Sequence, residues 1–154
     1  MRSLSKNLSF IVLCVLFIAV DGYADERSFF NFGFKFGHTF GDDGGFTVGT
    51  EMSYTTLSEK FGRGILIDYD VCQGRSKLHL GAELMAAGVG VSIGPTLAGQ
   101  YNQTVWGYTA TFLGGLFLYP YYSYTFTPNL QYHELGSYVK FAKQTAGRKF
   151  SFGG

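Results

Sequence analysis

Apolar and polar side chains alternate along most of this chain with a period of two residues, most clearly over Ser28–Phe40. Four phenylalanines fall on one face of this segment: Phe30, Phe32, Phe34 and Phe36. Asparagine, glycine, lysine and threonine occupy the other face. Because successive side chains of a β-strand point to opposite faces, this alternation predicts a strand. The glycines and aspartates of Gly41–Gly45 predict a turn directly after it.

The same alternation recurs in later segments, separated by short links rich in glycine or polar residues. The further predicted strands are Phe46–Leu57, Gly64–Cys72, Lys77–Ala86, Val89–Ala98, Trp106–Phe112, Leu116–Phe126 and Gln131–Ala142. Ala87-Gly88 and Gly114-Gly115 predict tight reversals, whereas Ser58–Arg63 and Gly99–Gln103 predict longer links. Strands of about ten residues are long enough to cross a hydrocarbon layer when they are tilted.

The first residues have the features of a secretory signal. Arg2 and Lys6 precede an unbroken apolar run, Phe10–Val20, and Gly22-Tyr23-Ala24 places small residues at the two positions that a signal peptidase reads. An apolar run this short disfavours the alternative of a membrane-anchoring helix, which normally needs about 20 residues. We therefore predict a signal peptide over residues 1–24 and a single mature domain.

The composition is unusual for a water-soluble domain. Aromatic residues make up 18% of the chain and charged residues only 15%, against about 25% charged residues in typical soluble domains. The formal net charge of +1 gives no support for nucleic-acid binding, which favours a basic face. Cys72 is the only cysteine outside the predicted signal, so the mature chain has no partner for an intramolecular disulfide and no cysteine cluster for a metal.

Side-chain volume indicates which face of the predicted sheet is outside. By count, the apolar face carries roughly thirty bulky side chains, whereas an eight-stranded barrel has an interior just wide enough to be filled by side chains. Rows of phenylalanine from one strand, with similar rows from the others, do not fit that interior. We therefore predict that the phenylalanines of the first strand face lipid.

The opposite face holds mostly small residues and a few charged ones, which suit a narrow lumen. We predict that six of its residues form a polar network there: Lys35, Glu51, Asp68, Asp70, His79 and Glu83. Since a buried charge is tolerated only when it is paired, Lys35 or Arg63, together with Lys140, is expected to meet the carboxylates. Such a network plugs the lumen, so an open pore is not expected.

Aromatic residues near the predicted strand ends suit the girdles that flank the apolar band of a membrane barrel. The residues assigned to these girdles are Tyr54, Tyr69, Trp106, Tyr108, Tyr122, Tyr124 and Tyr132.

With these features the chain resembles the superfamily of small bacterial outer-membrane β-barrels, which includes the OmpA transmembrane domain, the OmpX-like proteins and the opacity-type proteins. The resemblance covers nearly all of Asp25–Ala142 and rests on the signal peptide, the FNFGFKFG alternation, the GVGVSIGPTL stretch and the aromatic rows. It implies an all-β fold, a closed antiparallel up-and-down barrel of about eight strands over residues 25–142, followed by a polar tail over residues 143–154. Members often end in an aromatic residue, whereas here Phe152 is followed by two glycines.

The sequence offers little support for catalysis. His133 and Ser137 share a face of the last predicted strand, but at about 3.3 Å per residue they lie roughly 13 Å apart, too far for a hydrogen bond between a nucleophile and its base. Glu134 faces the other way. A metal site formed by His38, His79 and His133 depends on strand register, so no catalytic residue, metal or cofactor is predicted.

The predicted function is therefore that of a non-catalytic outer-membrane barrel with a structural or interaction role. Its expected partners are outer-membrane lipids and, during biogenesis, the barrel-assembly machinery, with no nucleic acid. Two alternatives remain: a soluble periplasmic β-barrel or sandwich that binds an apolar ligand, and a lipid-modifying enzyme of the outer membrane.

Overall fold

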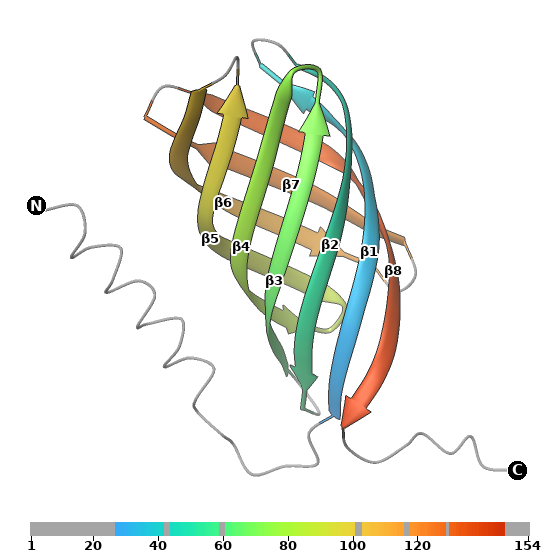
Figure 1. The fold of residues 1–154 in the computed structure, drawn as a ribbon. Helices are drawn as coiled ribbons and strands as arrows, with labels where there is room; N and C mark the ends of the chain where they lie inside the picture. The colour runs from blue at the N-terminus through green and yellow to red at the C-terminus, as the bar shows by residue number, and fades with distance from the viewer. Residues whose placement is uncertain are drawn as a thin grey trace, which may run out of the picture.

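The computed structural model describes residues 27–41, 44–58, 61–100, 103–115, 118–128 and 130–146. These residues form eight antiparallel strands in chain order, and the last strand pairs with the first to close a barrel (Figure 1). The strands are β1 (Arg27–Phe40), β2 (Gly45–Leu57), β3 (Phe61–Cys72), β4 (Arg75–Ala86), β5 (Val89–Gln100), β6 (Gln103–Gly114), β7 (Leu118–Phe126) and β8 (Gln131–Ala146). The predicted fold class and strand number are confirmed. The predicted signal peptide lies outside the described residues, among which no helix is long and apolar enough to cross a membrane.

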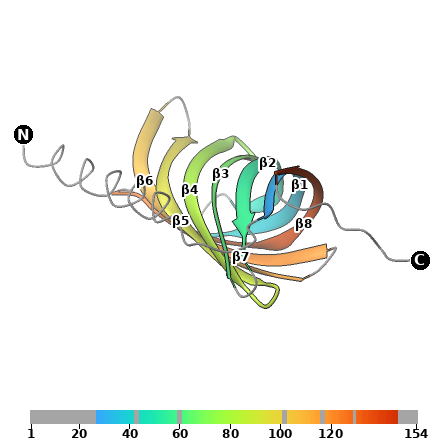
Figure 2. The ribbon, with the colours of Figure 1, turned by 90° about the horizontal axis from the view of Figure 1, so that it is seen from below.

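The register of the sheet sets the tilt of the strands, which Figure 2 shows from below as they curve around the barrel. Starting from Phe30, successive strand partners are Tyr54, Ile65, Ala82, Ile93, Ala110, Tyr124 and His133. His133 pairs with Phe40, so one circuit returns to β1 ten residues further along. For eight strands about 4.8 Å apart, this offset corresponds to a tilt of roughly 40°. A 12-residue strand such as β3 then rises about 30 Å, close to the thickness of a bilayer's hydrocarbon core.

The links between strands are short and alternate between the two ends of the barrel. The turns after β2, β4 and β6 lie at the same end as Arg27 and Ala146, the lower end in Figure 1. Ala87 and Gly88, with φ of 51° and 79°, form the tight turn after β4. Both take the left-handed conformation that a two-residue type I′ hairpin turn needs. The N–H of Gly115 donates to the carbonyl of Gly88 (2.9 Å), which ties this turn to the end of β6.

Several strands extend beyond the ends that the sequence predicts. The predicted link before Gly64 is partly strand, since β3 begins at Phe61, and the predicted loop from Gly99 to Gln103 is largely taken up by the ends of β5 and β6. Strand β8 continues to Ala146, so residues 143–146 are strand rather than part of the predicted tail. Main-chain hydrogen bonds continue past the point where side-chain alternation stops, because the ladder does not depend on the side chains.

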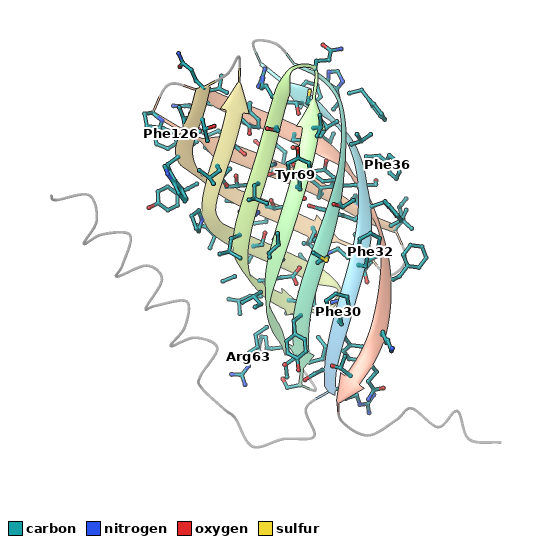
Figure 3. The ribbon with its side chains drawn as sticks, viewed as in Figure 1. Phe30, Phe32, Phe36, Arg63, Tyr69 and Phe126 are labelled. Atoms are coloured by element: carbon teal, nitrogen blue, oxygen red, sulfur yellow. The ribbon has the colours of Figure 1, made fainter. Side chains whose placement is uncertain are left out.

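Most large apolar side chains point outward, and every strand carries some of them. On β1, Phe30, Phe34 and Phe36 are 43–48% exposed, and Phe32 packs edge-on against Phe34 with ring centroids 5.0 Å apart; Figure 3 labels Phe30, Phe32 and Phe36 on this strand. The interior of the described barrel is lined mainly by hydroxyl-bearing and charged residues, together with Leu66 and a small cluster in which Leu113 packs with Tyr121 and Tyr138. A soluble barrel that binds an apolar ligand would carry its apolar face inside, whereas most large apolar side chains of the described barrel are on its outer face.

Three of the aromatic residues assigned to the outer girdles do not lie there. Tyr132 is only 5% exposed and faces the interior, because period two puts it on the face opposite to its exposed neighbour His133. Tyr108 and Tyr122 point outward but lie in the middle of β6 and β7 rather than at a strand end. Aromatic residues do flank turns at both ends of the barrel: Phe40 and Phe46 at one end, Tyr54 and Phe61 at the other.

Candidate functional site

The charged interior of the barrel is the candidate functional site. Every aspartate and glutamate that the structure describes lies inside and is at most 3% exposed: Glu51, Asp68, Asp70, Glu83 and Glu134. Lys35, Arg75 and Lys77 are also buried there, and the side chain of Lys140 is 10% exposed. Strand parity explains this sorting, since these side chains all fall on the face opposite to the apolar rows.

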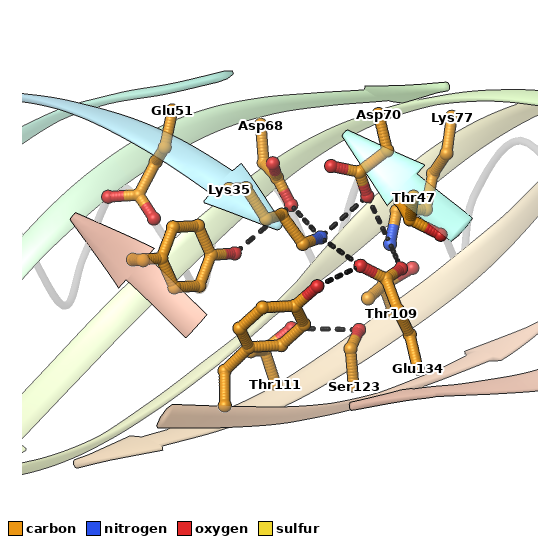
Figure 4. A network of polar contacts seen from close by, with 12 residues as sticks. Lys35, Thr47, Glu51, Asp68, Asp70, Lys77, Thr109, Thr111, Ser123 and Glu134 are labelled. Carbon is orange, nitrogen blue, oxygen red and sulfur yellow. Dashed lines mark hydrogen bonds and ion pairs between the residues drawn. The ribbon is translucent and has the colours of Figure 1, made fainter. Parts of the chain in front are cut away.

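A central cluster, defined here as Lys35, Lys77, Asp68, Asp70 and Glu134, joins four strands across the lumen (Figure 4). The Lys35 ammonium lies 3.1 Å from Asp68 Oδ2, 2.6 Å from Asp70 Oδ2 and 2.9 Å from Glu134 Oε1. Lys77 Nζ lies 2.7 Å from Asp70 Oδ2 and 3.1 Å from Glu134 Oε2. Two lysines thus bridge three carboxylates, so each charge in the cluster has an opposite partner.

Two buried tyrosines complete the central cluster. Tyr121 donates its hydroxyl hydrogen to Glu134 Oε1, and Tyr138 donates to Asp68 Oδ2 (3.4 Å). Their ring centroids lie 4.7 Å apart, and the Lys35 ammonium lies 4.6 Å from the centroid of Tyr121. The ammonium therefore gains a cation–π contact as well as its ion pairs.

Two facing glycines make room for the Tyr121 ring. Gly37 of β1 pairs with Gly136 of β8. A Cβ on Gly136 would lie 2.8 Å from Cε1 of Tyr121, and a Cβ on Gly37 would meet the tyrosine hydroxyl. Glycine at both positions is thus what allows a large ring to fill the lumen of an eight-stranded barrel.

A second group of charges, Lys140, Glu51 and Glu83, connects β8, β2 and β4. Lys140 Nζ lies 2.7 Å from Glu51 Oε1 and 3.8 Å from Glu83 Oε1. Thr55 donates its hydroxyl hydrogen to Glu83 Oε2 at 3.4 Å. Lys140 thus meets the predicted carboxylates, whereas Figure 3 places Arg63 at the lower end of the barrel.

Hydroxyl groups line the interior between β5, β6 and β7. Thr96 donates to Thr109 (2.7 Å), which is hydrogen-bonded to Thr125 (2.9 Å). One layer away, Thr111 donates to Ser123 at 3.0 Å. The first of these bonds joins β5 to β6, and the other two join β6 to β7, whose described ladder extends from the Tyr108–Phe126 pair to the Leu113–Tyr121 pair.

The structure brings together most of the residues predicted for the lumen. Lys35, Asp68 and Asp70 meet in the central cluster, and Glu51 and Glu83 meet Lys140. His79 also lies inside, 1% exposed, but neither ring nitrogen has a hydrogen-bond partner within the described part of the chain.

Five further charged or aromatic residues lie in the lumen that were not predicted there: Arg75, Lys77, Tyr121, Glu134 and Tyr138. Strict alternation along each strand is enough to place them inside. Arg75 and Lys77 have the parity of His79, Glu134 and Tyr138 have the parity opposite to His133, and Tyr121 has the parity opposite to the exposed Tyr122. The size of the two tyrosine rings favours an outward position, and the glycines opposite Tyr121 are what make room for its ring inside.

The residues considered for catalysis do not assemble into a reactive group. His133 lies on the outer face, where its Nδ1 is hydrogen-bonded to the hydroxyl of Tyr122, while Glu134 points into the lumen. Within the described ranges, no three histidine, cysteine, aspartate or glutamate side chains are placed to hold a metal ion.

Comparison with known proteins adds little at the level of sequence. The chain matches no protein-family model and no curated protein. Neisserial surface protein A is a similar solved structure, with 12% identity, a TM-score of 0.44 and coverage of 78% of this chain and 98% of that one. A chain described under "De novo design of transmembrane beta-barrels" has 12% identity and a TM-score of 0.41, covering 79% of this chain and 100% of its own. By its own geometry, a closed eight-stranded antiparallel barrel with apolar side chains outside and charged ones inside, the chain has the fold of the small outer-membrane β-barrels that its sequence resembles.

Proposed function

We propose that the chain is exported and spans the bacterial outer membrane as a non-catalytic barrel with a plugged lumen and a structural or interaction role. The distribution of charge between its two faces carries this proposal. All five described carboxylates are inside. The other charged residues that the structure describes, Arg27, Arg63 and Lys143, lie toward the end of the barrel that holds the first and last described residues. The outer face between the strand ends carries no charged side chain in the described chain.

A hydrocarbon layer explains this outer face better than water does. Large apolar side chains are exposed on all eight strands, whereas soluble monomers rarely expose apolar patches larger than about 300–600 Å². A lysine or arginine on the lipid face near the bilayer midplane costs roughly 2–4 kcal/mol, and the described chain has none there. Closure of the barrel also satisfies the backbone groups that lipid leaves without partners.

The filled interior supports a plugged rather than a conducting barrel. The central cluster and the Lys140 group place charged side chains from β1, β2, β3, β4 and β8 across the lumen. Tyr121 and Tyr138 fill part of the remaining space with rings that are 2% exposed. We expect no stable conductance from the purified barrel in planar bilayers.

The proposed partners follow from this location. Outer-membrane lipids surround the apolar face, and the barrel-assembly machinery inserts the chain during biogenesis. A lipid-modifying activity is less well supported, because His133 faces outward while Glu134 is held by lysines inside the lumen.

Fractionation of cells that express the full chain tests the proposal. We expect the protein in the outer-membrane fraction, resistant to carbonate washing and extracted only by detergent. Its unheated form should migrate differently from its boiled form on a gel, as closed barrels do. Recovery of the folded protein in the soluble periplasmic fraction would refute the membrane assignment.

A further inference from the structure

The Lys140 group has more carboxylates than cations. Its one ammonium, that of Lys140, faces two carboxylates, those of Glu51 and Glu83. In the rest of the described lumen the formal charges balance, because three carboxylates lie with three cations: Asp68, Asp70, Glu134, Lys35, Arg75 and Lys77. With all its members ionised, the Lys140 group would therefore leave one excess negative charge inside the barrel.

The other described cations do not supply the missing positive charge, because they belong to the outward face. Arg27, Arg63 and Lys143 all have outward parity in their strands. Arg63 pairs with Leu84 and Lys143 with Phe30, and both of these apolar partners are exposed. Paired residues of neighbouring strands lie on the same face of a sheet.

The two glutamates are close neighbours and are shielded from water. Glu51 is 1% exposed and Glu83 is 2% exposed. Both carboxylates approach the same nitrogen, Lys140 Nζ, at 2.7 and 3.8 Å. Within the described chain, neither oxygen of Glu51 has a hydrogen-bond partner, and neither does Glu83 Oε1. The pair therefore lacks a hydrogen-bond donor as well as a positive charge.

Five other strand residues near the pair are charged or titratable: Lys35, Asp68, His79, Tyr119 and Tyr138. Lys35 is engaged by the central cluster, where it contacts Asp68 at 3.1 Å (Figure 4). His79 lies four residues before Glu83 on the same strand, which is roughly 13 Å along β4 and too far for a hydrogen bond. The two tyrosines are neutral side chains under ordinary conditions. None of these groups compensates the second glutamate.

We propose that Glu51 and Glu83 hold one proton between them in the folded barrel at neutral pH. The proton comes from solvent and converts one carboxylate into a carboxylic acid. The group then consists of an ammonium, a carboxylate and a neutral acid, with no net charge. The acid O–H also supplies the missing donor, since a protonated carboxyl group can donate to its neighbour. Two carboxylates that share a desolvated site commonly keep one proton for this reason. The pair lies inside the barrel, so the proposal does not depend on the medium around the outer face.

Infrared spectroscopy of the purified barrel in deuterated buffer detects this proton directly. A protonated carboxylic acid has a carbonyl stretch that is separate from the carboxylate and amide bands. At neutral pH we expect this band in the wild type and its loss in both Glu51→Gln and Glu83→Gln, because each variant leaves one carboxylate for Lys140. Glu134→Gln is the matched control and should keep the band, since Glu134 already contacts Lys35 and Lys77. A wild type without the band would overturn the proposal, and this result does not require any variant to fold.

The pH dependence of stability is an independent readout. Glutamates of an unfolded chain are ionised above about pH 6, so the folded wild type should bind one proton more than the unfolded chain does. Relative to the two glutamine variants, its folded-to-unfolded ratio should fall about tenfold for each pH unit above about pH 6, until the pair loses its proton. An equal pH dependence in the wild type and both variants would refute the shared proton. A wild type that is stabilised by sodium at fixed pH, with no acid band, would assign the site to a metal cation instead and would also refute it.

Discussion

Lys35 is the residue whose removal tests the structure of the lumen most directly. It is fully buried, and its ammonium is the one group that contacts Asp68, Asp70 and Glu134 together. In the variant Lys35→Met, Lys77 still meets Asp70 and Glu134. Asp68 keeps only the Tyr138 hydroxyl at 3.4 Å among the polar contacts described for its Oδ2. The variant therefore leaves negative charge in the lumen without compensation.

The expected cost follows from that uncompensated charge. Removing one partner of a buried ion pair typically destabilises a protein by about 3–5 kcal/mol. Methionine keeps an unbranched chain of similar length against the Tyr121 ring, so the contribution from lost packing is small. We therefore expect Lys35→Met to lower the free energy of unfolding by about 3–5 kcal/mol, a large share of the 5–15 kcal/mol typical of native proteins.

Reversible urea unfolding of the barrel in lipid vesicles measures this change. Trp106, the only tryptophan, is 65% exposed on the outer face and reports on insertion through its fluorescence. Gel migration without heating gives a second measure of the folded fraction. Lys143→Met is the matched control, since it removes a lysine from the surface and should change stability by less than about 0.5 kcal/mol.

A double variant distinguishes the loss of the Lys35–Asp68 ion pair from a non-specific loss of stability. Adding Asp68→Asn to Lys35→Met removes the carboxylate that loses most when the lysine is absent. The two changes should be less destabilising together than their sum, with a coupling energy of about 0.5–3 kcal/mol. If Lys35→Met costs under about 1 kcal/mol, or if the two changes are simply additive, the central cluster does not stabilise the fold as the ion pairs suggest.

Three further tests address other parts of the molecule. Ile67→Lys, in the middle of the outer face of β3, should cost about 2–4 kcal/mol in vesicles, while Phe61→Lys at the end of the same strand should cost about 0–1 kcal/mol; equal costs would contradict a hydrocarbon belt. A Cβ on Gly94 would lie 1.9 Å from the carbonyl oxygen of Leu80, whereas one on Gly114 would have no non-neighbouring heavy atom nearer than 3.7 Å. Gly94→Ala should therefore lower the free energy of unfolding by about 1–3 kcal/mol and Gly114→Ala by much less, as urea titrations will show. Cys72, buried near the upper end, should react with a polar maleimide only after unfolding, and rapid labelling of the folded barrel would contradict its burial.

The sequence alone was enough to predict the fold class, the number of strands and the side of the sheet on which most residues lie. The reason is local: period-two alternation records the face of each side chain, whatever its neighbours. Phe30 and Phe34 could be assigned to the outside, and Lys35 and Glu51 to the inside, without any knowledge of pairing. The apolar side chains are together too bulky for the interior of an eight-stranded barrel, and this indicated which face of the sheet encloses the lumen.

Strand ends and the large interior rings were harder to predict. The additional strand residues at the start of β3, from Phe61, and at the end of β8, to Ala146, are held by main-chain hydrogen bonds. Such bonds leave no pattern in the side chains. Tyr121 fits inside only because Gly37 and Gly136 face it from two other strands. Each of these positions taken alone resembles an ordinary aromatic or glycine residue of a membrane barrel.

The partners within the lumen were decided by the tertiary structure. Lys77 and Glu134 are 57 residues apart in the chain, and they meet because the ten-residue offset of the closed sheet brings β4 and β8 to the same level across the lumen. An offset of two residues more or less would preserve every inward and outward assignment but would give each lysine different carboxylates. Alternation therefore determines the face of a residue, whereas closure and register determine what it touches. That second step leaves the Arg75 side chain against the ring of Tyr132 but without a hydrogen-bond partner among the described residues.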